Sequence, residues 1–338
     1  MPATSSDHIR QSADALLDLG DEHYASDRYS DALACYQEAL SRYRSIGDHH
    51  SRHGEANALF NLGEAHYMLD EYDEARARYQ EALLLYRAIG DSGDCDDHGD
   101  GLGAADVLKG IGAVHYMLDE YSEACTCYQE ALFLYRAHKD CDEHDACLGE
   151  ADTLRRLGDV HMYLDEYGEG DAYYQEALSL YHNLGDPGSR LGEANTLRSL
   201  GDVRLQVGEY GEARARYQEA LSLYHGIDDH LGEAHALRGL GHAHASLAEY
   251  AEACACYQAA ASLYCDLGDD LGEANVSYNA ACAHALQGQS VAACTMLEEA
   301  IALNEGYREK ARADIDFDAI RDTPEFRALV SSTGLPVE

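Results

Sequence analysis

A segment of about 40 residues recurs seven times along this chain of 338 residues, and the repetition limits the possible folds more than any other feature. The copies align on the glycine that ends the motif L-x-x-L-G, and the intervals between successive motifs are 43, 49, 46, 43, 40 and 40 residues. The aligned positions are Gly20, Gly63, Gly112, Gly158, Gly201, Gly241 and, in the seventh copy, Ala281. Because the length varies only between motifs, we expect identical structural modules joined by connections of unequal length.

Within each copy the apolar residues recur with the period of an α-helix, and the pattern is interrupted once. In the second copy one apolar stripe runs from Leu59 to Leu69, and the polar residues 70–73 follow it. A second stripe begins at Tyr72 and stops at Gly90, where glycine is typical of a helix C-terminus. Each copy is therefore predicted to be a hairpin of two antiparallel helices.

The hairpins resemble the tetratricopeptide repeat, in which an apolar residue, Leu-Gly, an aromatic, Ala, an aromatic and Ala stand at fixed offsets. The residues of the fifth copy that carry this resemblance are Leu197, Leu200, Gly201, Tyr210, Ala213, Tyr217 and Ala220. The copies exceed the common length of roughly 34 residues and lack the usual proline after the second helix. This longer variety resembles the arrays of kinesin light chains, cell-polarity adaptors and bacterial signalling ATPases. The resemblance implies an all-α protein, a right-handed α-solenoid of seven helix-turn-helix hairpins.

The chain is expected to have three parts: a tail at residues 1–9, seven repeats at residues 10–304, and capping helices with a tail at residues 305–338. The segment from Gly306 to Val330 resembles the closing element of bacterial and organellar repeat arrays. Thr323 and Pro324 have the residue types of an N-cap and a first helical residue. The side chains expected to cover the apolar edge of the last hairpin are Phe317, Ile320, Phe326 and Leu329.

Tyrosine and small residues mark the framework of each copy. Three repeat positions, which are Tyr29, Tyr36 and Tyr43 in the first copy, account for 18 of the 25 tyrosines. We interpret them as packing residues, and we interpret the motif glycine as a residue that lets helix backbones approach closely. One further position carries His23, His66, His115, His161, His244 and His284, with Arg204 in the fifth copy. These histidines are also interpreted as packing residues between paired helices, and the alternative is sensitivity to acid near pH 6.

The charge balance excludes two classes of partner. The chain has 63 acidic and 24 basic residues, a formal net charge of -39. Nucleic acid and anionic membranes are not expected to bind it, because phosphate recognition needs clustered positive charge. The sequence has no apolar run of 18 residues and no hydrophobic signal segment at its start, so the expected location is the cytoplasm.

No catalytic, cofactor or metal site is predicted. The Gly-Lys and His-Glu dipeptides and the patterns G-x-S-x-G and C-x-x-C are all missing. The connections at residues 91–100 and 140–145 concentrate carboxylates, but a calcium loop aligned on Asp94 would place Ala105 where a bidentate Glu is needed. We interpret them as flexible acidic loops, with adventitious divalent cation binding as the alternative.

One face of the first helix of each hairpin is the candidate binding surface. When the motif glycine is counted as position 8, positions 2, 5, 9 and 12 share this face, which lines the concave groove in tetratricopeptide arrays. Position 5 carries Lys109, Arg155, Arg198 and Arg238 in four consecutive copies. These cations either face a ligand or pair within the helix, since Asp159 and Asp202 stand four residues after two of them. Position 2 adds Asn57, Asn195 and Asn275, and position 12 adds Tyr24, Tyr67 and Tyr116. The asparagines would hold a peptide backbone, and the tyrosines form either an aromatic floor or ordinary packing.

These patterns favour a protein-interaction scaffold without catalysis. Its partner would be a peptide or helix of another protein, and acidic groups of that partner would meet the basic row in the concave groove. The alternative is a structural protein that forms head-to-tail filaments, because the first hairpin has no cap comparable to the C-terminal one.

Overall fold

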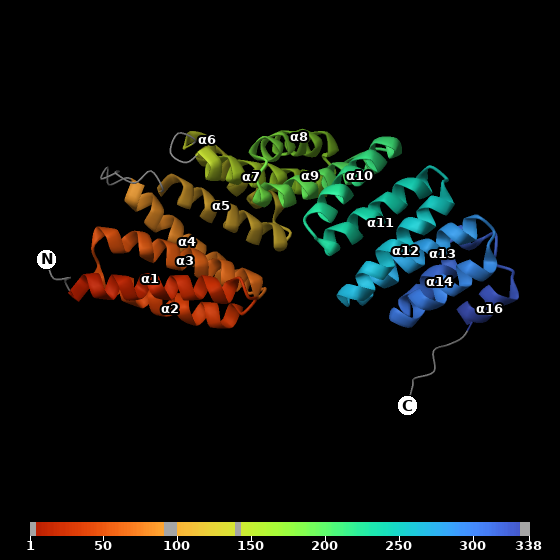
Figure 1. Cartoon of the computed structure of the whole chain (residues 1–338), viewed down its shortest axis with the longest axis horizontal. Helices are drawn as coiled ribbons and strands as arrows, with labels where there is room; N and C mark the ends of the chain where they lie inside the picture. Colours follow the sequence, from red (N-terminus) through yellow and green to blue (C-terminus); the bar gives the residue numbers. More distant parts are fainter. Residues whose placement is uncertain (1–4, 91–99, 139–142, 332–338) are drawn as a thin grey trace, which may run out of the picture. The chain divides into compact units, whose positions relative to one another are not determined.

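In the computed structural model, residues 5–90, 100–138 and 143–331 are described, and they form helices and turns without a single strand. Fourteen of the helices form seven successive antiparallel pairs, and a short helical segment follows the last pair (Figure 1). The predicted all-α stack of helical hairpins is confirmed. The acidic connections expected to be flexible lie largely outside the described residues. Among the described helices, none combines the length and the apolar character needed to cross a membrane.

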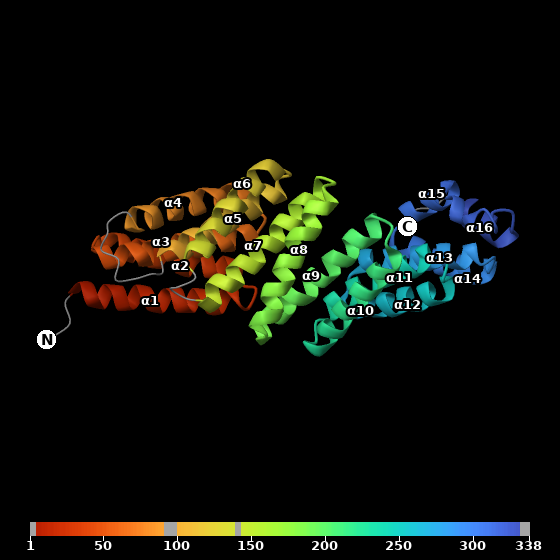
Figure 2. The same ribbon diagram turned by 90° about the horizontal axis from the view of Figure 1, so that it is seen from above.

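The chain divides into two compact units, Met1–Leu180 and Tyr181–Glu338, and the division falls inside one helix. The first unit contains α1 (Ser5–Tyr24), α2 (Tyr29–Ile46), α3 (His49–Met68), α4 (Tyr72–Gly90), α5 (Asp100–Met117), α6 (Tyr121–Ala137), α7 (Glu143–Tyr163) and most of α8 (Tyr167–Leu184). From α2 to α6, each second helix packs against its own first helix and the first helix of the next hairpin. The first helices α1, α3, α5 and α7 also pack side by side in this order (Figure 2).

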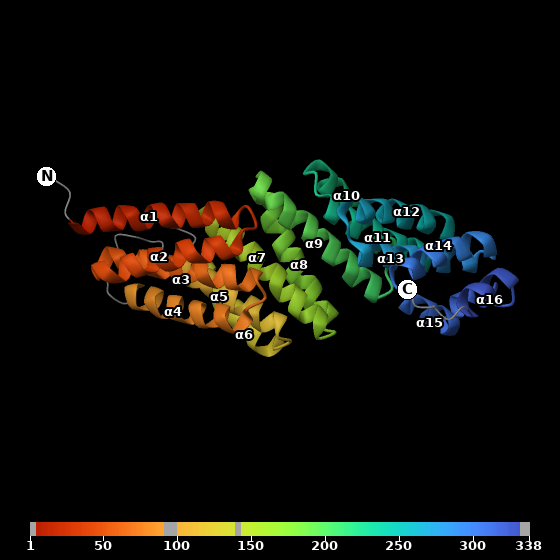
Figure 3. The ribbon, with the colours of Figure 1, turned by 90° about the horizontal axis from the view of Figure 1, so that it is seen from below.

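The second unit repeats this arrangement and ends in a cap. It contains α9 (Pro187–Gln206), α10 (Tyr210–Gly226), α11 (His230–Ser246), α12 (Tyr250–Leu267), α13 (Asp270–Leu286) and α14 (Ser290–Leu303). The cap consists of α15 (Gly306–Ala313), the 3-10 turn η1 (Ile315–Phe317) and α16 (Pro324–Ser331). It packs on α13 and α14 (Figure 3).

The cap buries the aromatic residues that the sequence suggested. Phe317, Ile320 and Phe326 are 0%, 1% and 1% exposed, and Leu329 packs against the same cluster at the end of the last hairpin. Thr323 accepts a hydrogen bond from the backbone N–H of Phe326 at 3.4 Å, as the N-cap of α16 should. These side chains cover apolar surface that would otherwise face water.

Two of the three framework tyrosines hold the paired helices together in each of the first four hairpins. In the first copy the Tyr29 hydroxyl donates to Asp27 at 2.6 Å, and Asp27 adopts a positive φ of 57° in the turn between the helices. The ring of Tyr36 lies against Gly20, where an added Cβ would come within 2.4 Å of it. The Tyr36 hydroxyl donates to Asp21 at 2.7 Å. The motif glycine thus makes room for a tyrosine ring, which corrects our interpretation that it serves close approach of backbones.

The third framework tyrosine joins one hairpin to the next. The ring of Tyr43 lies against Gly54 in the following copy, where a Cβ would come within 2.3 Å of it. Its hydroxyl donates to Asp14 of its own first helix at 2.5 Å. Since Tyr43 is 3% exposed, both the ring and the hydroxyl are satisfied by this junction. The same contact recurs between Tyr135 and Gly149, so the stack is built from one repeated joint.

Candidate partner-binding face

The predicted basic row lies on the first helices α5, α7, α9 and α11. Lys109 and Arg155 occur on two neighbouring helices of the first unit, and Arg198 and Arg238 occur on two neighbouring helices of the second. All four side chains are half-buried. The row is therefore present as two pairs, one in each unit.

Three of the four cations have carboxylate partners inside the chain. Arg155 contacts Asp159 at 3.2 Å and Arg198 contacts Asp202 at 3.0 Å, which are the pairs that the sequence offered as the alternative. Lys109 Nζ lies 3.2 Å from Asp106 and 4.0 Å from Asp152, and the sequence analysis identified neither acid. No carboxylate in the described residues lies within 4.0 Å of Arg238, so this cation differs from the other three.

Two histidines lie next to Arg238 on α11. Burial is the main cause that lowers the pKa of His235 and of His242 to about 4, and the charge of Arg238 contributes to that lowering. Both imidazoles are therefore neutral near pH 7. His235 Nδ1 lies 2.8 Å from the Tyr264 hydroxyl, and His242 Nε2 lies 3.0 Å from Asn279 Nδ2.

The predicted asparagines take part in the framework. Asn57 accepts a hydrogen bond from the Tyr86 hydroxyl, and Asn195 accepts one from Tyr224 at 2.8 Å. Asn275 is half-buried on α13. The carbonyl oxygens of Asn57 and Asn195 each use one lone pair in these bonds, so the second lone pair and the amide N–H groups remain for a peptide backbone.

The predicted tyrosines of position 12 pack against a tyrosine of their own hairpin, and Tyr116 also contacts Tyr163 of the next hairpin at 5.3 Å. Each ring makes an edge-on contact with the first tyrosine of the second helix, and the centroid distances are 5.3 Å for Tyr24–Tyr29, 5.7 Å for Tyr67–Tyr72 and 5.7 Å for Tyr116–Tyr121. Ordinary packing, the alternative in our sequence analysis, therefore describes these contacts. Tyr67 in addition lines the pocket described next.

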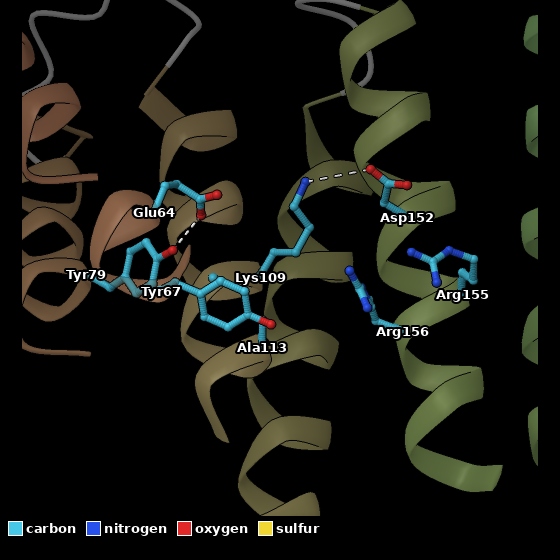
Figure 4. A pocket seen from close by; sticks show the side chains of 9 residues that line it. Glu64, Tyr67, Tyr79, Lys109, Ala113, Asp152, Arg155 and Arg156 are labelled. Carbon is cyan, nitrogen blue, oxygen red and sulfur yellow. Dashed lines mark hydrogen bonds and ion pairs between the residues drawn. The ribbon is translucent and has the colours of Figure 1, made fainter. Parts of the chain in front are cut away.

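A pocket of about 160 Å³ opens on the first-helix face of the first unit (Figure 4). Its lining combines three cations and two carboxylates from α3, α5 and α7 with aromatic and small residues. The lining residues are Glu64, Tyr67, Tyr79, Lys109, Gly110, Ala113, Asp152, Arg155 and Arg156. The sequence analysis had identified Tyr67, Lys109 and Arg155 but had missed Glu64, Asp152 and Arg156.

Glu64 is the most buried acid of the pocket. Burial raises its pKa, and the hydrogen bond from the Tyr79 hydroxyl at 2.5 Å and the charge of Lys109 oppose that rise. Glu64 follows the motif glycine directly, as Asp21 does in the first copy. This acid could have been found in the sequence, because a buried tyrosine 15 residues later needs an acceptor.

The repeated histidines fasten the turns between paired helices, so our interpretation of them as simple packing residues was incomplete. His66 Nδ1 lies 2.6 Å from Glu71 Oε2, five residues later and across the turn. The same contact joins His115 to Glu120 at 2.5 Å, His161 to Glu166 at 2.6 Å and His244 to Glu249 at 2.6 Å. The acid at the fifth following residue was the signal in the sequence.

One group of side chains has the composition of a metal site. Cys282, Asp314 and Asp316 bring their ligand atoms within 4.8 Å of one another. Asp314 already accepts hydrogen bonds from the Tyr278 hydroxyl at 2.6 Å and from the backbone N–H of Asp316 at 3.1 Å, where it caps η1. These bonds account for the position of Asp314 through the folding of the cap, and we assign no metal to the group.

The sequence pattern of the tetratricopeptide repeat family matches residues 11–88, 149–226 and 193–266, together more than half of the chain. The chain therefore belongs to the tetratricopeptide repeat family. No curated protein sequence matches it.

Several solved structures share the fold at low sequence identity. A signal-transduction ATPase of Pyrococcus horikoshii with a tetratricopeptide repeat sensor superposes with a TM-score of 0.69 at 15% identity, covering 94% of this chain and 46% of the ATPase. This chain thus spans less than half of that protein. The apo quorum sensor NprR from B. thuringiensis gives a TM-score of 0.64 at 17% identity, covering 85% of this chain and 75% of NprR. The Rap conjugation gene regulator of plasmid pLS20, in complex with the Phr* peptide, gives a TM-score of 0.56 at 17% identity, covering 88% of this chain and 75% of the regulator. Identities at this level show the fold alone.

Proposed function

We propose that this chain is a non-catalytic scaffold that binds a peptide or helix of a partner protein on its first-helix face. The observation that carries the proposal is the row of half-buried cations on this face in a chain with a formal net charge of -39. Three cations line the pocket of the first unit, and Arg238 in the second unit has no carboxylate within 4.0 Å in the described residues. Acidic groups of a partner complement such sites.

The structural neighbours support this class of function. The Rap regulator of plasmid pLS20 carries a bound peptide, and it has the same fold over 88% of this chain. We extend peptide binding from that protein to this one, and we propose a cytoplasmic location for the encounter. Fold alone does not name a partner, so the proposal depends on the charged residues of the face.

Charge reversal tests the proposal. The triple variant R155E/R198E/R238E should recover at least about tenfold less partner from a native lysate, since each reversal replaces an attraction with a repulsion. The amounts recovered would be measured by quantitative mass spectrometry. A matched variant, R44E/R87E/R216E, makes the same charge change on the second helices α2, α4 and α10 and should recover the partner as the unaltered chain does. Equal recovery by both triple variants would contradict the proposal.

The filament alternative remains a prediction with weaker support. A copy that stacks on the C-terminal end would have to dock on the cap, because Phe317, Ile320 and Phe326 already cover α13 and α14. Light scattering of the purified chain distinguishes the cases, and we expect a single monomer mass. A mass that grows with concentration would favour the filament.

A further inference from the structure

The residue after the motif glycine, position 9, accepts a hydrogen bond from a buried tyrosine in four of the seven copies. The donor is the second framework tyrosine, always 15 residues later in the chain. The pairs are Asp21 with Tyr36 at 2.7 Å, Glu64 with Tyr79 at 2.5 Å, Asp159 with Tyr174 at 2.7 Å and Asp202 with Tyr217 at 2.6 Å. A carboxylate at position 9 is thus the standard acceptor of this face.

The third copy lacks that carboxylate. Ala113 occupies position 9, and Tyr128 stands 15 residues later. Tyr128 is 1% exposed, and its hydroxyl is buried without a hydrogen-bond partner in the described structure. A buried hydroxyl without an acceptor costs free energy, so this place favours any group that can accept its proton.

A second donor reaches the same place from the next hairpin. Where the first and second copies meet, Asn61 at position 6 donates to Asp21 at position 9 at 3.1 Å. Where the third and fourth copies meet, Arg156 holds position 6 and Ala113 holds position 9. The carboxylate nearest to Arg156 in the described residues is that of Asp159, with 3.9 Å between Arg156 Nη1 and Asp159 Oδ2. The guanidinium of Arg156 therefore has N–H donors available for a further acceptor, and it faces Ala113.

The unfilled place adjoins the pocket of the first unit through Ala113, while the buried Tyr128 hydroxyl is not part of the lining. Ala113, Arg156 and Lys109 all line that pocket, and Figure 4 shows the Lys109 ammonium group directed at Asp152. The volume of about 160 Å³ equals roughly five water molecules, which is ample for a carboxylate. Within the lining, the three cations exceed the carboxylates of Glu64 and Asp152 by one charge, and Asp106 and Asp159 contact these cations from outside the lining. The pocket therefore fits one negative charge better than two.

We propose that this pocket binds the carboxylate of one glutamate or aspartate side chain of the partner, which takes the place of the acid missing at Ala113. The Tyr128 hydroxyl and the Arg156 guanidinium donate to it, and Lys109 adds a charge nearby. This inference rests on the proposed function and names the chemical group that the first unit recognises.

A small probe tests the pocket without the natural partner. The probe is N-acetyl-glutamate N-methylamide, a single glutamate side chain between two peptide groups, and its glutamine analogue is the neutral control. Binding would be followed by NMR through the carbon-13 methyl group of Ala113 in the full chain. We expect saturable shifts with the glutamate probe and at least about tenfold weaker binding of the glutamine analogue.

Three variants separate the proposed contacts from general effects. A113D should supply the missing carboxylate, raise the melting temperature by about 2 °C and abolish probe binding. Y128F and R156Q should weaken the binding of the probe and leave the melting temperature within about 1 °C of that of the unaltered chain, since neither donor has a strong partner in the free chain. Probe binding to these variants would be followed through the methyl group of Ala113, or of Ala151 for A113D. The matched control is A248D, an equal charge change at a turn position where Asp27 stands in the first copy, and it should bind the probe like the unaltered chain.

Three results would overturn the inference. They are unchanged probe binding by A113D, equal binding of the glutamate probe and its glutamine analogue, and equally tight binding of inorganic phosphate at the methyl group of Ala113. The proposed function has its own readout in the R155E/R198E/R238E pull-down. If charge reversal reduces partner recovery but the glutamate probe does not bind, the scaffold function is supported and the carboxylate pocket is rejected. If the probe binds but charge reversal leaves partner recovery unchanged, the pocket is supported and the proposed function is rejected.

Discussion

At the scale of single residues, glycine and tyrosine form complementary pairs throughout the stack. A Cβ on Gly201 would lie 2.7 Å from the ring of Tyr217, closer than side-chain carbons tolerate. Tyr217 is fully buried and its hydroxyl is bonded to Asp202, so the ring cannot move aside without losing both interactions.

The pairing predicts opposite effects of the same substitution at two helical glycines. G201A should lower the free energy of unfolding by about 1 to 2 kcal/mol, because overpacking outweighs the gain in helix propensity. G211A should raise it by less than about 1 kcal/mol, because nothing lies within 4 Å of the new methyl group. Urea unfolding followed by circular dichroism measures both, and equal effects of the two variants would contradict the pairing.

Two half-buried histidines give the second unit a predicted response to acid. Burial lowers the pKa of His235 and of His242 to about 4, below the value near 6.5 of an unfolded chain. The unfolded chain therefore binds more protons, and the contribution of the neutral histidines is complete above pH 6.5 and falls as the pH drops towards 4. The groups that face them include Arg198, Arg238 and Asp269.

The expected loss is about 1 kcal/mol for each of these two histidines at pH 5.5. The melting temperature should fall between pH 7.5 and 5.5, and the variant H235N/H242N should fall by less. Differential scanning calorimetry at the two pH values measures the difference. A curve that shifts equally in both proteins would assign the acid response to other groups, including the repeated histidines that the sequence first suggested.

At the scale of helices, a contact between the repeated histidine and the acid five residues later links the paired helices in the second, third, fourth and sixth copies. Arg204 with Glu209 and His284 with Gln289 make the equivalent contact in the fifth and seventh copies. The first copy departs from this pattern, because Arg28 stands where Glu71 stands in the second copy. His23 Nδ1 is buried without a hydrogen-bond partner in the described structure. The substitution R28E should supply the acceptor.

R28E should stabilise the first hairpin by about 0.5 to 1.5 kcal/mol, the usual range for one hydrogen bond. The added negative charge acts against this gain in so acidic a chain, so the comparison needs a double-mutant cycle with H23A. The gain should disappear in the H23A background while the charge penalty persists. Native-state hydrogen exchange of α1 and α2 reports the local stability, and an equal effect of R28E in both backgrounds would show that no contact forms.

The sequence predicts the helical pairs, the packing role of the tyrosines and the cap, because each depends on a local and repeated pattern. It places Lys109 and Arg155 on the first-helix face for the same reason. The pocket does not follow from such a pattern. It depends on Gly110 and Ala113, two positions where the third copy lacks a functional group, and on Arg156 from the next hairpin. The carboxylate partners of Lys109 were also missed, since Asp152 reaches it only when α5 and α7 pack together.

At the scale of the whole molecule, a stack of hairpins presents two different kinds of surface. The first helices offer half-buried cations and a pocket, whereas exposed apolar and charged side chains such as Leu84 and Arg87 occupy the second helices. Because each hairpin contacts only its neighbours, a ligand stabilises the helices that it touches and their immediate neighbours. The surface that a partner uses can therefore be read helix by helix.

Hydrogen-exchange mass spectrometry of the chain with and without its affinity-purified partner shows which helices the partner covers. We expect slower exchange in α3, α5 and α7 of the first unit and in α9 and α11 of the second, with little change in α2, α4 and α12. Slower exchange centred on α4, α6 or the cap, with α5 and α7 unchanged, would contradict a partner-binding face built from the first helices.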